Sequence, residues 1–285
     1  MSDIMNLIKD LRSKTGAGFL DCKKALSENN NSLDEAIEYL RKKGLAKASK
    51  KSSREANEGA IGIYSNDNIT ALLKINSETD FAAKSDTFLN FLDEIGNVII
   101  ENDNASLTKD NLLNLKFKDE TIANYLKNKI AQIGENLILN DLLIIENHKS
   151  FNSYYVHNSY KKNIGKIISL INYETKNNDD KIKTLSKNIC MHVAAMKPDA
   201  LDIKDLDVNL IEKEKKIQKE LILSSGKPEN IVDKILEGKM KKYYSEVTLL
   251  NQNFILDQEK TVSQIISDYK EKYDYKIISY NIFSL

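Results

Sequence analysis

Residues 77–84, with the sequence SETDFAAK, bring a hydroxyl, a carboxylate and an aromatic ring together at one point of the chain. They follow an alternating, strand-like run and precede a run with helical periodicity, which predicts a strand-to-helix corner. Thr79 or Asp80 can cap the free backbone N–H groups at the start of that helix. The chemistry that these side chains offer is therefore hydrogen bonding and apolar contact.

Phe81 lies at this corner and outside both periodic runs, which leaves two interpretations open. In the first, the ring packs back on its own helix as a hydrophobic staple. In the second, the ring is held out for contact with a partner. The local residues alone favour the staple.

The sequence gives little support for bond-making chemistry. It contains no Walker-type glycine loop, no GxSxG and no His/Cys arrangement with supporting spacing. Cys22 and Cys190 lie far apart without a C-x-x-C motif, so neither a disulfide framework nor a zinc site is predicted. Cys22 and His192 fall among apolar residues on predicted helices, and we expect both to be packing residues. We expect no catalytic residue, no metal site and no cofactor.

The charge balance restricts the class of partner. The 285 residues include 42 Lys or Arg and 42 Asp or Glu, and Trp is absent. An RNA-binding translation protein is an alternative, but it would present a basic, aromatic-rich face, and we expect no nucleic-acid partner. No apolar run reaches transmembrane length, and no signal or transit pattern is present, so we expect a cytoplasmic protein without a membrane partner.

The first 44 residues predict three short helices with a small shared core. The first helix has the apolar spacing of a one-sided helix, at Ile4, Leu7, Ile8 and Leu11. The second begins at Phe19, and the third is capped by Ser32 and is expected to end at Gly44. Residues 45–58 predict a solvated linker or a helix extension. Such a small unit would leave apolar surface exposed, which favours a docking module.

The rest of the chain alternates strands with helices. Strands are expected at 60–65, 69–76, 137–146, 153–157, 164–173 and 276–284. Helices are expected from the corner to about 102 and at 121–135, 179–196, 209–225, 229–244 and 261–272. The order of strands followed by a helix occurs twice, which suggests two α+β subdomains, while residues 103–118 are left unassigned. The two helices from 209 to 244 predict a protruding antiparallel hairpin.

Several of these segments carry a family resemblance. The run from Leu11 to Leu26, LRSKTGAGFLDCKKAL, resembles the opening motif of elongation factor Ts, the guanine-nucleotide exchange factor of bacterial elongation factor Tu. The Thr79-Asp80-Phe81 corner, IGEN at 133–136 and HVAAMKP at 192–198 resemble further signatures of that family. The motifs occur in the family's order, and the resemblance extends from residue 4 to about residue 283.

The resemblance implies a domain organisation for this α+β chain. Residues 1–54 would form an N-terminal three-helix, UBA-like docking domain with its linker. Residues 55–140 would form a core N-subdomain, and residues 141–285 a core C-subdomain that includes the coiled-coil hairpin at about 209–244. Both subdomains would contain antiparallel sheets. The further C-terminal helical module of some family members is expected to be absent.

The resemblance also implies a partner and a mechanism. Elongation factor Tu would be the protein partner, and the chain would be a non-enzymatic exchange factor without a nucleotide site of its own. In the family, the Asp-Phe pair is wedged between two helices of the GTPase nucleotide domain and disturbs the Mg²⁺ site. Carried over to Asp80 and Phe81, this role favours the wedge over the staple. Whether the chain also forms a homodimer is left open by the sequence.

The positions that match the family's partner contacts, or lie in its Thr-Asp-Phe motif, are Arg12, Phe19, Leu20, Thr79, Asp80, Phe81, Ala82, Ala83, Ile133 and His157. Two of them lie where the chain departs from the family pattern. Phe19 places an aromatic ring where the family has a long apolar residue. His157 precedes residues 158–163, which we expect to form a longer turn than the family's short Gly-Arg turn.

Overall fold

The computed structural model describes residues 2–147, 150–226 and 228–285. The chain forms two compact units that interleave in sequence. The N-terminal unit consists of Met1–Glu146, Asn158–Lys166 and Ser284–Leu285, and the C-terminal unit consists of Asn147–His157 and Ile167–Phe283.

The N-terminal unit contains three helices followed by a mixed α/β region. Its elements are α1 (Ser2–Thr15), α2 (Phe19–Glu28), α3 (Leu33–Lys51), β1 (Glu58–Ser65), β2 (Ile69–Ser77), α4 (Asp80–Ala83), α5 (Asp86–Asn102), α6 (Lys109–Asn114), β3 (Lys116–Phe117), β4 (Glu120–Thr121), α7 (Ile122–Ile133) and β5 (Leu137–Glu146). Residues 103–118, which the sequence left unassigned, therefore include α6 and β3.

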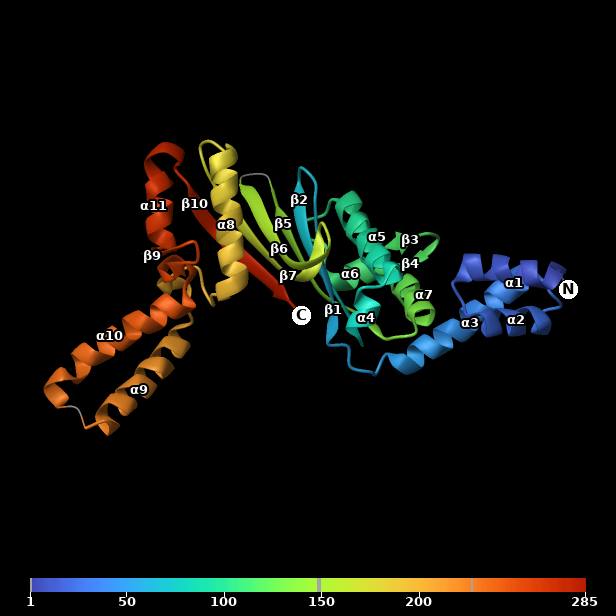
Figure 1. Cartoon of the computed structure of the whole chain (residues 1–285), viewed down its shortest axis with the longest axis horizontal. Coiled ribbons are helices and arrows are strands. Elements are labelled where there is room, and N and C mark those ends of the chain that lie inside the picture. Colours follow the sequence, from blue (N-terminus) through green and yellow to red (C-terminus); the bar gives the residue numbers. More distant parts are fainter. Residues whose placement is uncertain (1, 148–149, 227) are drawn as a thin grey trace. The chain divides into compact units, whose positions relative to one another are not determined.

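An antiparallel sheet with helices on one side builds the core of this unit. β1 pairs with β2 and β2 pairs with β5, in both cases antiparallel. α5 lies across β1 and β2 (Figure 1) and buries a line of apolar side chains, Phe88, Phe91, Leu92, Ile95 and Ile99. The close approach depends on Gly96, where a Cβ would lie 2.3 Å from the Tyr64 ring. This core supplies a rigid platform for the chain that leaves β2.

The N-terminal three-helix bundle has its own small core, made of Ile8, Leu11, Cys22, Ala25, Leu26 and Ala36. The Ser32 side chain caps α3 by accepting a hydrogen bond from the N–H of Glu35, as predicted. The predicted end of this helix at Gly44 is wrong, because α3 continues to Lys51. Gly44 instead allows a close helix contact, since a Cβ there would lie 2.9 Å from the Cβ of Ala131 on α7. The first half of residues 45–58, as far as Lys51, is thus a helix extension.

The C-terminal unit contains strands, helices and a long helical hairpin. Its elements are most of β6 (Phe151–Lys161) and β7 (Ile164–Glu174), then α8 (Asp180–Met196), η1 (Ile203–Asp205), α9 (Val208–Ser224), α10 (Glu229–Val247), η2 (Leu249–Asn251), β8 (Asn253–Phe254), β9 (Asp257–Thr261), α11 (Val262–Tyr273) and β10 (Lys276–Ser284). The longer turn expected at 158–163 is wrong, because β6 continues to Lys161 and only two residues separate it from β7.

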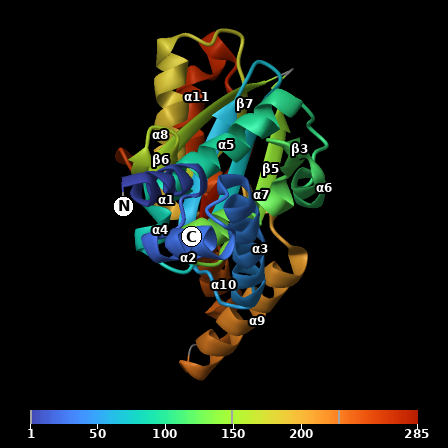
Figure 2. The same cartoon turned by 90° about the vertical axis from the view of Figure 1, so that its right-hand side faces the viewer.

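The helices α9 and α10 form the predicted antiparallel hairpin. Gly226 supports the turn with a left-handed φ of 72°. Figures 1 and 2 show from two directions that the hairpin extends away from the strands of its own unit. Ile222 and Val232 are buried in it, whereas Leu210 and Leu221 are exposed. The α+β class, with N-terminal helices, antiparallel sheets and this hairpin, is confirmed.

His192 is a packed structural residue, as the sequence predicted. Its side chain is fully buried in α8, and its Nε2 lies 2.9 Å from Oε1 of Gln252. The backbone N–H of Ile255 donates to Nδ1 at 3.2 Å. Nδ1 is therefore an acceptor and Nε2 carries the proton, which is the neutral imidazole. Burial lowers the pKa of His192 below its ordinary value.

This lowered pKa predicts a pH dependence of stability. The unfolded chain binds a proton at His192 near pH 6.5, whereas the folded chain resists protonation, so stability present above that pH is lost as the pH falls. We expect the free energy of unfolding to decrease from pH 7 to pH 5. His192→Gln should flatten this decrease. Urea unfolding of both proteins at pH 7, 6 and 5 measures the effect, and parallel curves would contradict it.

Candidate partner interface

The corner after β2 is built from two helices instead of the single helix that the sequence predicted. α4 contains only four residues, Asp80–Ala83, and α5 begins at Asp86 with Ser85 as its cap. Thr79 is the cap of α4, because its Oγ1 accepts a hydrogen bond from the N–H of Ala82 at 3.2 Å. The break between the two helices separates the corner from the long buried helix that follows it.

Phe81 is the most exposed large apolar side chain of the corner, with 84% of its surface accessible. Its neighbours Ala82 and Ala83 are buried, and α4 contacts both β1 and β2. The staple interpretation is therefore wrong, because the ring does not pack on its own helix. The small alanines anchor α4 to the sheet, and the ring remains on the surface.

Asp80 lies next to this ring and is paired with Lys84. The Lys84 ammonium lies 2.6 Å from Oδ2 of Asp80, one helical turn away. This hydrogen bond holds the pKa of Asp80 below its usual value. The corner thus presents an ionised carboxylate beside an exposed ring, which suits contact with a polar site bordered by apolar surface.

Two carboxylates fasten the corner to the turn between α7 and β5. The backbone N–H and the hydroxyl of Thr79 both donate to Glu135, at 2.9 and 2.7 Å. In the opposite direction, the N–H of Asn136 donates to Oε1 of Glu78 at 2.6 Å. That contact is the largest of the effects that lower the pKa of Glu78. We call Glu78, Thr79, Glu135 and Asn136 the clasp.

The clasp was not predicted from the sequence. IGEN at 133–136 was predicted only as the end of a helix and as a family resemblance, and nothing in it indicated a contact with a residue 56 positions away. Gly134, with a φ of 87°, ends α7 and so lets the chain turn towards β2. Arg54, three residues beyond the end of α3, also contacts the clasp. Its guanidinium lies 3.3 Å from Glu78, and its carbonyl accepts a hydrogen bond from the Asn136 side chain.

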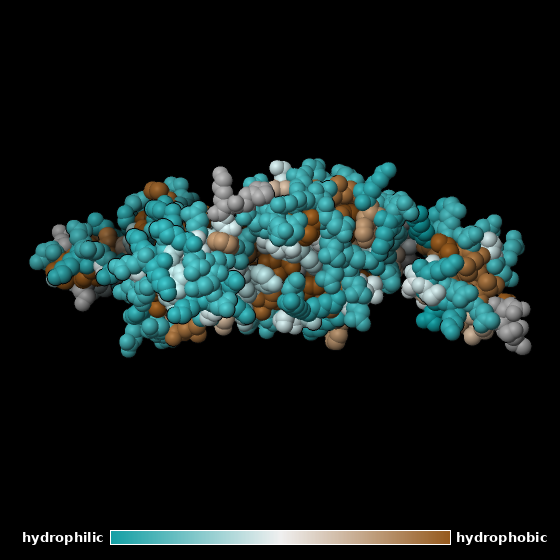
Figure 3. All heavy atoms as spheres, turned by 90° about the horizontal axis from the view of Figure 1, so that it is seen from above, coloured by the Kyte–Doolittle hydropathy of each residue, from teal (hydrophilic) through white to brown (hydrophobic). Residues whose placement is uncertain are grey.

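The three predicted contact residues of the bundle are exposed. Arg12 is on the surface of α1, and the exposed fractions of Phe19 and Leu20 are 40% and 79%. Ile4 and Met5 add further exposed apolar surface. Figure 3 shows apolar side chains on the surface of the bundle, at the right of the view. Leu20 is therefore not a core residue of the bundle.

The remaining predicted contacts differ in their surroundings. Ile133 is half-buried and packs against the core of the N-terminal unit, next to the clasp. His157 is exposed on β6 in the C-terminal unit, with its Nδ1 3.2 Å from the hydroxyl of Tyr155. The structure therefore brings Thr79 to Ala83 together with the residues that follow Ile133, while His157 belongs to the other unit.

Metal and thiol chemistry receive no structural support. In the described residues, no group of three or more His, Cys, Asp or Glu could hold a metal ion. Burial raises the pKa of Cys22, and it raises that of Cys190 to about 12. Both thiols are therefore protonated packing groups. None of the helices in the described parts of the chain is both long and apolar enough to cross a membrane.

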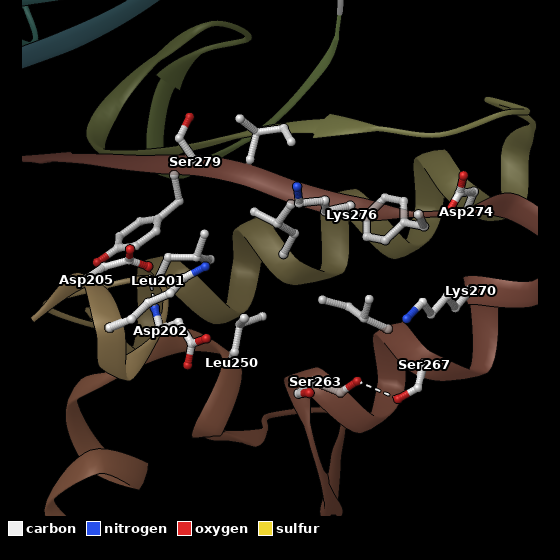
Figure 4. Close-up of a pocket in the computed structure, with 16 residues that line it drawn as sticks. Leu201, Asp202, Asp205, Leu250, Ser263, Ser267, Lys270, Asp274, Lys276 and Ser279 are labelled. Carbon is white, nitrogen blue, oxygen red and sulfur yellow. Dashed lines mark hydrogen bonds between the residues drawn. The ribbon is translucent and has the colours of Figure 1, made fainter.

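The C-terminal unit contains a cavity of about 660 Å³. It is lined by residues of η1, α11 and β10 (Figure 4). Several of its polar groups are already paired, since Asp202 and Asp205 form the capping box of η1 and the Ser267 hydroxyl donates to the carbonyl of Ser263. It contains no residue of the predicted interface.

Comparison with known proteins agrees with these features. The family "Elongation factor TS" matches residues 78–285. The elongation factor Ts of Rhodospirillum centenum is 39% identical over 267 residues, covering 92% of this chain and 85% of the relative. That of Methylorubrum extorquens is 42% identical over 264 residues, with coverages of 92% and 85%. That of Halothermothrix orenii is 42% identical over 268 residues, with coverages of 93% and 87%.

The fold and these matches define the class of the protein as a translation elongation factor. The family match covers far more than half of the chain and begins at Glu78, within the clasp. The chain belongs to the elongation factor Ts family.

The exposure of Phe81 predicts that its loss leaves the fold stable. Phe81→Ala removes little buried surface, so we expect the free energy of unfolding to change by less than about 0.5 kcal/mol. The matched control is Phe88→Ala in α5, which removes a fully buried ring and should cost about 3–5 kcal/mol. Thermal unfolding of the two variants measures the difference. Equal losses would return Phe81 to the staple interpretation.

Proposed function

We propose that this chain binds elongation factor Tu in its GDP-bound form and accelerates the release of GDP, so that GTP can bind. The observation that carries the proposal is the exposed Phe81 ring, held beside an ionised Asp80 on a clasped corner. The names of the relatives support the same role in translation. The chain acts by binding and catalyses no covalent step.

The corner can act as a wedge because it offers binding energy that depends on the state of the partner. A GTPase holds its nucleotide through phosphate contacts and Mg²⁺. A ligand shifts such an equilibrium only by its difference in affinity for the two states. Burying one large apolar side chain contributes about 1.5–3 kcal/mol, which is about a 10- to 150-fold effect. If the Phe81 ring is buried only in the state of elongation factor Tu whose Mg²⁺ site is disturbed, binding of this chain lowers the affinity of elongation factor Tu for GDP by that factor.

The three-helix bundle would supply the docking contact that holds the wedge near its target. Arg12 and Leu20 are exposed on α1 and α2, where a partner helix can reach them without unfolding the bundle. Ile133 and His157 would add contacts at the core. A docking surface that binds both nucleotide states equally raises the occupancy of the complex without changing the release rate within it.

The first test of this function is the release of a fluorescent GDP analogue from elongation factor Tu. The wild-type chain should accelerate release. Phe81→Ala and Asp80→Ala should lower the release rate at saturating concentration by about tenfold or more, since each removes part of the wedge. Tight binding of GDP or GTP by the isolated chain, or no effect of the wild type on release, would overturn the proposal.

A second test separates docking from wedging. Leu20→Ala should raise the half-saturating concentration about tenfold through lost apolar burial, while the release rate at saturation should change little. The structure favours this substitution over removal of residues 1–44, because α3 runs through Gly44 and would be cut. The matched control is Leu221→Ala on α9, which is also exposed. Equal effects of both variants would contradict the docking role of Leu20.

A further inference from the structure

The clasp joins two segments that are far apart in sequence by hydrogen bonds in both directions. Thr79 gives two hydrogen bonds to Glu135, and Asn136 gives one to Glu78. Asn136 is buried, and the Glu78 side chain is 21% exposed. Hydrogen bonds to charged groups are stronger than neutral ones, and partial burial reduces competition from water.

We propose that Glu135, supported by Glu78, is a positioning residue that holds the Asp80-Phe81 corner in its active geometry. Neither carboxylate is a predicted partner contact. Their contribution to nucleotide exchange rests on the proposed function, whereas their contribution to the corner geometry does not.

The direction of the hydrogen bond from the Thr79 hydroxyl explains how Glu135 supports the capping of α4 by Thr79. A threonine hydroxyl has one proton to donate and lone pairs with which to accept. Glu135 accepts that proton, so the lone pairs of Oγ1 are free to accept from the N–H of Ala82. Thr79 is thereby fixed as the cap of α4. A helix of only four residues has too few internal hydrogen bonds to persist alone in water, so its geometry depends on this cap.

The other half of the clasp ties the corner to the end of α3. Glu78 is paired with the Arg54 guanidinium, and the Asn136 side chain donates to the Arg54 carbonyl at 2.7 Å. Lys51, the last residue of α3, donates to the carbonyl of Gly134. The corner, the end of α7 and the end of α3 are therefore fixed to one another through the same few groups.

Glu135→Gln is the sharp test, because it keeps the size of the side chain and changes only its hydrogen-bonding capacity. A carboxylate accepts from both Thr79 donors, whereas an amide has one acceptor oxygen and places an NH₂ against the second donor. One Thr79 donor is then left without its partner, which is costly in a partly buried site. The matched control is Glu101→Gln, at an exposed position on α5.

Two measurements on the full-length chain test the proposal. Amide hydrogen exchange at Thr79 and Ala82 should become about tenfold faster in Glu135→Gln, which equals about 1.4 kcal/mol of lost protection. Release of GDP from elongation factor Tu at saturation should fall about five- to tenfold, with a half-saturating concentration within about twofold of the wild type. Glu101→Gln should match the wild type in both measurements.

Each outcome is decisive. Unchanged amide exchange in Glu135→Gln would overturn the positioning role, and so would faster exchange with a normal release rate. If the wild-type chain fails to accelerate release, the proposed function is wrong, while amide exchange still decides whether Glu135 holds the corner. If Glu135→Gln does not fold, Glu78→Gln takes its place, and faster exchange at the Asn136 amide is then the expected result.

Discussion

The hydrogen bonds from Thr79 to Glu135 are the contact on which the geometry of the candidate interface depends. Phe81 is an apolar residue that is 84% exposed to water. The backbone beneath it is a four-residue helix, which is too short to be stable without outside contacts. The buried Ala82 and Ala83 stabilise this helix through apolar contacts, and Glu135 stabilises it through its hydrogen bonds with Thr79.

The core of the N-terminal unit is built without the Phe81 ring. Phe88, Phe91 and the other buried residues of α5 pack with residues of β1 and β2 in one core, and the exposed Phe81 ring is not part of it. In the proposed function, stability and partner binding therefore depend on different residues. A substitution at the surface of the corner can change binding without unfolding the protein, which is rarely true for a buried aromatic residue.

Much of this fold could be predicted from the sequence, and the errors have physical causes. The strand Leu137–Glu146 and the final strand Lys276–Ser284 were predicted with the bounds that the structure shows. Local patterns could not reveal why Gly44 lies inside α3, because its role is a close approach to Ala131 on another helix. Residues 158–163 were predicted as a longer turn because they depart from the family's short Gly-Arg turn, yet residues 158–161 continue β6.

In the candidate site, too, the features that depend on neighbouring residues were predicted, and the contacts between residues far apart in sequence were not. The Thr79-Asp80-Phe81 sequence marked the corner, and the capping role of Thr79 was one of two local alternatives. Local sequence could not decide between staple and wedge, because exposure of the ring depends on how the whole unit packs, and its core includes residues from Ala48 to Ile164. The clasp was equally hidden, since Glu78 and Asn136 meet only in the folded chain.

The central claim is that Phe81 couples the binding of this chain to the loss of GDP from elongation factor Tu. The most direct measurement is the affinity of the wild-type chain and of Phe81→Ala for elongation factor Tu with and without GDP, by titration calorimetry. Linkage requires that GDP weaken binding of the chain by the same factor by which the chain weakens binding of GDP. We predict that Phe81→Ala reduces this factor by about 10- to 150-fold through the loss of one buried ring. An equal loss of affinity for both forms, with the factor unchanged, would contradict the wedge.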